Sequence, residues 1–123
     1  AYQGHQGPAS TFSPVHLMNA HLAQGATASF TFPADYSTSL LVIHGSVQVN
    51  AEALVPTDNF VLFENQGTDF TITAEEADTI VLVMSGEPIL EPIASHGPFV
   101  MNSQAEIAEA FADFEAGKFG KLI

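Results

Sequence analysis

The sequence predicts an all-β protein that ends in one α-helix, and three observations carry this prediction. Between residues 12 and 84, short runs of alternating apolar and polar residues recur along the chain. Turn-forming Gly, Pro, Asn and Asp residues separate these runs. A helical apolar pattern stands out only near the C-terminus. Many short strands at close spacing favour an antiparallel sandwich or barrel over alternating strands and helices.

The predicted strands follow from the period of two that a half-buried strand requires. Val15 and Leu17, for example, alternate with His16 and Met18. Gly45 is expected to turn or bulge the chain after the strand-like run at residues 37–44. The remaining strands are expected within residues 29–32, 47–49, 60–64, 70–73 and 79–84.

Residues 103–117 carry the helical pattern. Ser103 and Glu106 have the spacing of a capping box, in which hydroxyl and carboxylate satisfy free backbone donors. The apolar stripe of this helix consists of Ile107, Ala110, Phe111 and Phe114. Gly117 suits the left-handed residue that ends a helix. The stripe packs either on the barrel of the same domain or on a neighbouring domain, and the sequence leaves both open.

Length and composition indicate one domain over residues 1–123. Hydrophobic residues make up 46% of the chain, which is enough to bury a core, and no apolar run approaches the ~20 residues of a membrane span. The lack of cysteine excludes disulfides and a cysteine nucleophile, and we expect a cytoplasmic protein. No basic and apolar leader is visible. Because the chain starts at Ala1, we expect a processed chain or a piece of a longer protein.

The protein is strongly acidic. Fourteen Asp and Glu residues face two bases, Lys118 and Lys121, and the formal net charge is −12. Nucleic-acid binding depends on Lys and Arg that neutralise phosphates, so this class of partner is excluded. Anionic membrane surfaces are disfavoured for the same reason.

Residues 84–102 predict an extended strap between the last strand and the helix. Pro88, Pro92 and Pro98 cannot donate to a β-ladder and hold the chain extended. We expect this strap to cross a surface that faces another domain.

The same region carries a long motif. Residues 86–89 read Gly-Glu-Pro-Ile, residues 91–93 Glu-Pro-Ile, residues 97–102 Gly-Pro-Phe-Val-Met-Asn and residues 117–120 Gly-Lys-Phe-Gly. In order, spacing and residue type, this motif resembles the C-terminal signature of the pirin family. Looser matches at residues 13–15, 25–26 and 45–49 extend the resemblance over nearly the whole chain.

The resemblance implies a cupin, or jelly-roll, antiparallel β-barrel with one C-terminal α-helix. Pirins are bicupins, and the matching part is the second, C-terminal cupin. In the family, an iron-type metal lies in the first cupin, held by three His and one Glu. The activities implied by the family are oxygenation of flavonols such as quercetin and, in animals, transcriptional co-regulation. Iron is therefore expected only in an N-terminal cupin that this chain does not contain.

The cupin metal pattern can also be aligned on this chain through its glycines. Its four ligand positions then fall on Thr31, Pro33, Thr38 and Phe70. Divalent iron or manganese requires imidazole and carboxylate donors that converge on one point. These four residues supply neither, so we assign no metal ligand.

The five histidines do not replace this set. They are His5, His16, His21, His44 and His96. His16 and His21 are five residues apart on a predicted strand, so they point to opposite faces. His5 is interpreted as a solvated loop residue, and His44 and His96 as residues at bends. No closely spaced histidine pair of a metal site is present.

Catalytic motifs are equally lacking. Glu87 and Glu91 are the best candidate carboxylate pair, but an extended segment places them roughly 13 Å apart, too far for a retaining pair. No nucleophile elbow or phosphate loop occurs. We assign no catalytic or cofactor-binding residue.

Three functions follow from these observations. The first is a cupin half of a pirin-like protein that binds no metal and has a structural and interaction role beside a metal-bearing N-terminal cupin, its expected partner. The second is a part of an iron-dependent quercetin 2,3-dioxygenase whose active site lies in the missing half. The third is a free-standing cupin that binds a small ligand. A domain without its neighbour would expose its Phe-bearing surface, which predicts self-association.

Overall fold

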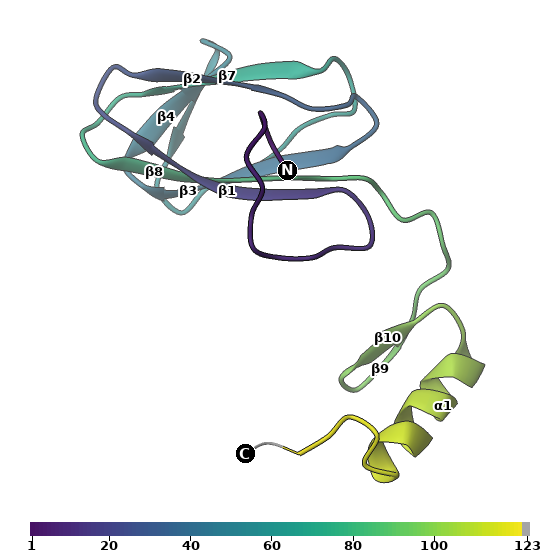
Figure 1. Cartoon of the computed structure of the whole chain (residues 1–123). Helices are drawn as coiled ribbons and strands as arrows, with labels where there is room; N and C mark the ends of the chain where they lie inside the picture. The colour runs from purple at the N-terminus through teal and green to yellow at the C-terminus, as the bar shows by residue number, and fades with distance from the viewer. Residues whose placement is uncertain (122–123) are drawn as a thin grey trace. The chain divides into compact units, whose positions relative to one another are not determined.

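A computed structural model describes residues 1–121 and shows two compact units (Figure 1). The first unit comprises Ala1–Pro88, and the second begins at Ile89. The sequence predicts a single domain over residues 1–123, whereas the contacts of the chain separate at Pro88. Each unit is therefore described by itself.

The first unit consists of two four-stranded antiparallel sheets that face each other (Figure 1). One sheet contains, in spatial order, β1 (Val15–Leu22), β8 (Thr79–Gly86), β3 (Ser37–His44) and β6 (Phe60–Leu62). The other contains β2 (Thr27–Thr31), β7 (Asp69–Ala74), β4 (Ser46–Val49) and β5 (Ala53–Pro56). The predicted all-β antiparallel architecture is confirmed. Within the first unit, the sequence patterns missed one strand, β5, a four-residue edge strand that ends in proline, where period-two alternation is too short to stand out.

The core lies between the two sheets. Val81 and Val83 of β8 have no exposed surface, nor do Val47 and Ile72 of the facing sheet. Each strand contributes alternate residues, because successive side chains point to opposite faces of a sheet. Burial of one such side chain contributes about 1.5–3 kcal/mol. This core holds the two sheets together and leaves both outer faces uncovered by other strands of the unit.

Gly45 joins the two sheets between β3 and β4, and the pairing of β3 with β8 shifts in register between Val42 and His44. The backbone of Gly45 is left-handed, with φ of +77°. A Cβ atom at this position would lie 2.4 Å from the Thr79 hydroxyl oxygen. Glycine is therefore favoured at position 45 for two reasons, the left-handed backbone angle and the close approach of Thr79 in β8.

The second unit contains a short hairpin within the region of the predicted strap, followed by the predicted helix. β8 continues to Gly86, and β9 (Ala94–His96) pairs with β10 (Phe99–Met101). Within the region predicted as an extended strap, residues 84–102, the chain thus turns back on itself once, at Gly97 and Pro98. Gly97 and Pro98 form the two-residue loop of this hairpin, and Gly97 has a positive φ of 55°. Pro98 is tolerated there because a loop residue does not need to donate a backbone hydrogen bond to the neighbouring strand.

The helix α1 (Gln104–Glu115) is capped at both ends. The Ser103 hydroxyl accepts from the Glu106 backbone N–H, and the Glu106 carboxylate accepts from the Asn102 backbone N–H at 3.0 Å. The reciprocal bond thus reaches one residue further back than in the predicted capping box. At the other end, Gly117 has a φ of +74°, and the N–H groups of residues 117 and 118 donate to the carbonyls of residues 114 and 113. This pair of bonds is a Schellman motif.

The apolar stripe of α1 packs on the β9–β10 hairpin of its own unit. The Phe111 ring meets Phe99 edge-on, with 4.9 Å between ring centroids, and lies 5.6 Å from the His96 ring. Ile107 and Ala110 are buried. The sequence left open whether this stripe packs on the barrel or on another domain. It did not predict the hairpin, because the prolines in this region argue against strands.

A search of residues 1–121 for a helix both long and apolar enough to cross a membrane found none.

Gly45→Ala is expected to destabilise the first unit more than Gly25→Ala. Both glycines have nearly equal positive φ, +77° and +76°, so each substitution adds about 1–2 kcal/mol of backbone strain. Only at Gly45 does the new Cβ overlap Thr79, which adds on the order of 1–3 kcal/mol. Urea unfolding of the two variants measures the difference. Equal losses would show that Thr79 moves aside without cost.

Candidate functional site

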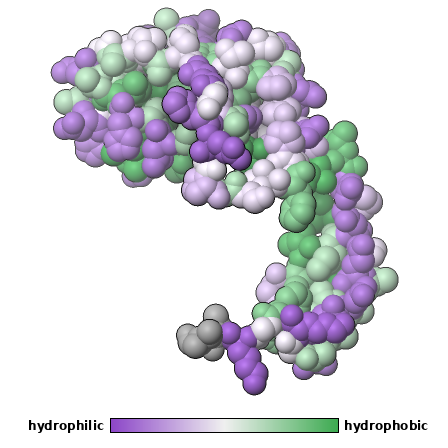
Figure 2. Space-filling view, in the orientation of Figure 1, coloured by the Kyte–Doolittle hydropathy of each residue, from purple (hydrophilic) through white to green (hydrophobic). Residues whose placement is uncertain are grey.

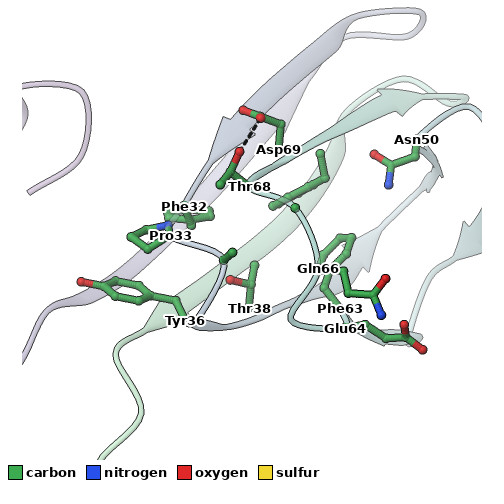
Figure 3. A pocket seen from close by; sticks show the side chains of 13 residues that line it. Phe32, Pro33, Tyr36, Thr38, Asn50, Phe63, Glu64, Gln66, Thr68 and Asp69 are labelled. Atoms are coloured by element: carbon green, nitrogen blue, oxygen red, sulfur yellow. Dashed lines mark hydrogen bonds between the residues drawn. The ribbon is translucent and has the colours of Figure 1, made fainter.

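A small cavity of about 80 Å³ lies between the two sheets, and Figure 3 shows the side chains around it. Its walls come from the β2–β3 loop, β3, the β4–β5 turn, the β6–β7 loop and the start of β7. The aromatic lining consists of Phe32, Tyr36, Phe63 and Phe70. The polar side chains are Thr38, Asn50, Glu64, Gln66, Thr68 and Asp69. No histidine contributes to it, and its volume suits a few water molecules.

Three of the four positions aligned with cupin metal ligands line this one cavity. They are Pro33, Thr38 and Phe70, which come from three different segments of the first unit. The fourth, Thr31, is the last residue of β2, and its hydroxyl donates to the carboxylate of the lining residue Asp69. The fold thus brings together the positions where the cupin pattern has its ligands.

The side chains at these positions do not fit a metal ion. The Thr38 hydroxyl is buried and hydrogen-bonded to the Ser85 hydroxyl, with 2.8 Å between the oxygens. The Phe70 ring packs between Phe63 and Phe30, at centroid distances of 4.4 and 5.1 Å. Pro33 has no side-chain donor atom. A divalent iron or manganese ion would find neither imidazole nor converging carboxylates here.

Sequence reasoning missed both charged residues at this cavity, Glu64 and Asp69, of which Asp69 is the one held by side-chain hydrogen bonds. Its two carboxylate oxygens accept from the hydroxyls of Thr31 and Thr68, at 2.5 and 2.6 Å. These bonds, first that from Thr31 and then that from Thr68, lower the pKa of Asp69. The sequence signal was its place directly before Phe70, next to an aligned ligand position. Both hydroxyls favour the ionised carboxylate, so Asp69 stays charged as a hydrogen-bond acceptor.

His16 is the most enclosed of the histidines in the first unit. Its ring lies 5.9 Å from Tyr2, 5.2 Å from Phe32 and 6.2 Å from Tyr36, between centroids. Burial, and secondarily the positive N-terminal amine, lower the pKa of His16. Tyr2 also accepts a hydrogen bond from the Thr31 backbone N–H at 3.1 Å. The N-terminal residues thus contribute a side chain beside the inner face of β1.

The remaining sequence candidates are dispersed. His21 is exposed on the other face of β1 from His16, as the strand alternation predicts, and the His44 ring bonds to the Asp78 carbonyl oxygen. Glu87 and Glu91 are exposed and belong to different units. Over residues 1–121, no cluster of three or more His, Asp or Glu side chains could hold a metal ion.

A scan against protein families supplies the decisive finding: residues 17–120 match the model described as the pirin C-terminal cupin domain. The chain belongs to the pirin family. This membership and the cupin fold confirm what the C-terminal motif predicts. The position of the motif, from β8 through α1, shows that it codes for the hairpin and helix of the second unit as well as for the end of the barrel.

Known proteins agree with this assignment. A crystal structure of a quercetin 2,3-dioxygenase from Acinetobacter baumannii is 38% identical, with a TM-score of 0.85 over all of this chain and 42% of that chain. A Pseudomonas aeruginosa protein, provisionally named a quercetin 2,3-dioxygenase, is 36% identical over 96% of this chain and 41% of its own length. Pirin of Mus musculus is 32% identical over 89% of this chain and 39% of its own length. This chain spans about two fifths of the length of these relatives.

Thr31→Val and Thr68→Val are each expected to raise the pKa of Asp69 toward its ordinary value, Thr31→Val by more. The pKa of Asp69 is lower in the folded than in the unfolded chain. The two hydrogen bonds therefore stabilise the fold when the pH is above the pKa of Asp69 in the unfolded chain, and this stabilisation is lost as the pH falls through the pKa of Asp69 in the folded chain. An NMR titration of the Asp69 carboxyl carbon measures the shift. As a control, Thr27→Val removes a hydroxyl of the same strand that bonds Thr73, and should leave the Asp69 pKa unchanged.

Thr38→Val is expected to destabilise the first unit by about 1–3 kcal/mol, because it leaves the buried Ser85 hydroxyl without its partner. The double variant Thr38→Val/Ser85→Ala should lose less than the sum of the two single losses. A double-mutant cycle in urea measures this coupling. Additive losses would mean that water replaces Thr38 at the Ser85 hydroxyl.

Proposed function

We propose that this chain is the half of a pirin-type protein that does not bind the catalytic metal, and that it serves structure and partner contact beside a metal-bearing N-terminal cupin. One observation carries the proposal. Pro33, Thr38 and Phe70, at three of the four positions that align with cupin metal ligands, line one cavity, but their side chains are hydrophobic or carry a hydroxyl group. Metal chemistry in the whole protein then belongs to the other half.

The cavity chemistry supports this division. Its only carboxylates are those of Glu64 and Asp69, and both oxygens of Asp69 already accept hydrogen bonds. Beside the cavity, the aromatic rings of Phe30, Phe63 and Phe70 pack against one another, so the Phe70 position presents a ring and no metal-binding atom. A cupin interior filled in this way gains core stability from the same residues that prevent coordination.

The second unit supports the interaction role. It is shorter than 40 residues, a size at which a chain rarely holds a stable core without disulfides, metals or a partner. Its exposed apolar side chains include Leu90 at 92% and Ile93 at 81%. Figure 2 shows hydrophobic residues gathered along the segment that follows β8. Exposed apolar surface of this kind marks a site of protein contact.

If the whole protein is a flavonol dioxygenase, as the names of two relatives indicate for those proteins, the reaction takes place in the part that this chain does not match. The present domain would then support the reacting half, and iron would be bound there alone. The lack of cysteine agrees with a reducing, cytoplasmic location, and the fourteen acids argue against nucleic acid as a partner.

The test is elemental analysis of the purified chain after incubation with Fe(II), together with the loss of quercetin absorbance. We expect iron well below one equivalent and no turnover, because the cavity lacks a donor set. The Pseudomonas aeruginosa relative, prepared in the same way, is the matched positive control. One iron per chain with quercetin consumption would contradict the proposal.

A further inference from the structure

We propose that the slot filled by the Tyr2 ring, at the open edge of the sandwich between β1 and β2, is a binding site for a small neutral phenol. Tyr2 is then an intramolecular occupant that such a molecule displaces. The inference goes beyond the proposed function, because it concerns neither the metal nor the other half of the protein. Of the residues that surround the slot, Phe32 alone also lines the small cavity.

The N-terminal segment, residues 1–12, precedes β1 as a loop (Figure 1). Tyr2 is half-buried, whereas every other residue of this segment is exposed. Within residues 1–121, the hydroxyl of Tyr2 forms the one hydrogen bond that joins the segment to later parts of the chain. A single aromatic side chain therefore anchors the segment, in the manner of a bound ligand.

Three rings from both sheets surround the Tyr2 ring. The His16 ring belongs to β1 and meets it edge-on, with 5.9 Å between ring centroids. Phe30 in β2 lies at 6.3 Å, and Phe32, directly after β2, at 5.2 Å. Burial lowers the pKa of His16, so its ring is uncharged at neutral pH. All three neighbours thus offer uncharged aromatic surface, which favours another aromatic ring between them.

A backbone N–H forms the polar end of the slot. β2 is an edge strand that pairs with β7. The Phe32 N–H donates toward β7, to the Thr68 carbonyl oxygen, so the N–H of the preceding residue, Thr31, points away from that strand. It donates to the Tyr2 hydroxyl oxygen at 3.1 Å. A ring that carries a hydroxyl group therefore matches both the aromatic walls and the free donor of the slot.

The turn that presents Tyr2 is held by bonds within the segment. The backbones of Tyr2 and His5 exchange two hydrogen bonds, at 2.8 and 2.9 Å. Gln3 and Gly4 between them have positive φ angles of 46° and 81°, as in a type I′ turn. These bonds persist when the segment leaves, so release of the ring breaks one hydrogen bond, that from Thr31.

Space for a molecule larger than one ring lies beside the slot. A hollow of about 920 Å³ is enclosed between residues 1–11 and the start of β1, and Tyr2 and His16 are among the residues that line it. Pockets for small organic molecules have volumes of about 300–1,000 Å³. A phenol that replaces Tyr2 can thus carry further groups into this hollow.

The charges near the slot select a neutral ligand. No Lys or Arg occurs before Lys118, so no side chain of the first unit can neutralise a carboxylate or a phosphate. The α-amine of Ala1 adjoins Tyr2 in the chain and leaves the slot together with it. A phenolic hydroxyl, with an ordinary pKa of about 10, is uncharged at neutral pH. The class of ligand that fits is therefore a neutral phenol and not an aromatic acid.

The probe is p-cresol, the side chain of tyrosine as a free molecule, and toluene is the same molecule without the hydroxyl. Each is titrated by NMR into the native chain and into the variants Tyr2→Ala, Tyr2→Phe and Phe12→Ala. The signals followed are the backbone amide of Thr31 and the ring of His16. Phe12→Ala is the matched control, because it removes a fully exposed aromatic ring of the same segment.

We expect Tyr2→Ala to bind p-cresol roughly tenfold more tightly than the native chain, because in the native chain the slot is open for only a fraction of the time. Toluene should bind Tyr2→Ala more weakly than p-cresol, because it offers the Thr31 N–H no acceptor. Phe12→Ala should behave as the native chain does. Tyr2→Phe keeps the ring without its hydroxyl and should lie between the native chain and Tyr2→Ala.

The proposal is overturned if Tyr2→Ala binds p-cresol no more tightly than the native chain, or if toluene binds this variant as tightly as p-cresol. If Tyr2→Ala does not fold, the native chain decides. There p-cresol should shift the ring signals of Tyr2 toward those of a free peptide of residues 1–12, and Tyr2 signals that stay unmoved would refute the site. None of these results depends on the iron analysis, so the two proposals can fail separately.

Discussion

The position of β8 between β1 and β3 is the constraint on which the rest of this structure depends. β8 pairs with β1 over all eight of its residues and with β3 over nearly as many. Its inward residues are Thr79, Val81, Val83 and Ser85, and its outward residues are Ile80, Leu82, Met84 and Gly86. Thr79 approaches Gly45 closely, and Val81 and Val83 lie in the core. Ser85 bonds to Thr38 at the cavity, and the outward residues lie in the middle of the apolar outer face of the sheet. Alternation along a single strand couples all four features.

The cavity shows how a fold can keep a site's geometry without its chemistry. The fold brings residues of the β2–β3 loop, β3 and β7 together at one cavity. Coordination, however, depends on the atoms that the side chains present. With Phe70 and Thr38 in these places, the convergence produces aromatic packing and a buried hydroxyl pair. The same geometry that would bind an ion here stabilises the interior.

Both units expose apolar side chains. The first unit has an interior large enough for its own stability, yet one of its outer faces carries no charge. The second has a small core of Phe99, Phe111 and Ile107, and more apolar side chains outside it than within. Apolar surface in water is costly at about 25 cal/mol per Å².

The sequence by itself determined the antiparallel class, the positions though not the limits of most strands, the turn at Gly45 and the C-terminal helix. Period-two alternation, glycine in the left-handed region and capping residues act over a few neighbours, which is why these features can be predicted from the sequence. The sequence also determined the family, through a motif in which order and spacing are specific. The sequence did not predict the β9–β10 hairpin, because prolines at residues 88, 92 and 98 indicate an extended chain whether or not two short strands pair with each other.

Only the tertiary structure decided which residues meet. The hydrogen bonds that Thr31 and Thr68 donate to Asp69, the enclosure of His16 by Tyr2 and the pairing of Thr38 with Ser85 join residues far apart in the sequence. The apolar outer face of the β1–β8–β3–β6 sheet likewise requires strand order and register, since Leu17 and Leu62 reach the same face only through β8 and β3. Local patterns specify elements, whereas long-range pairing specifies surfaces and sites.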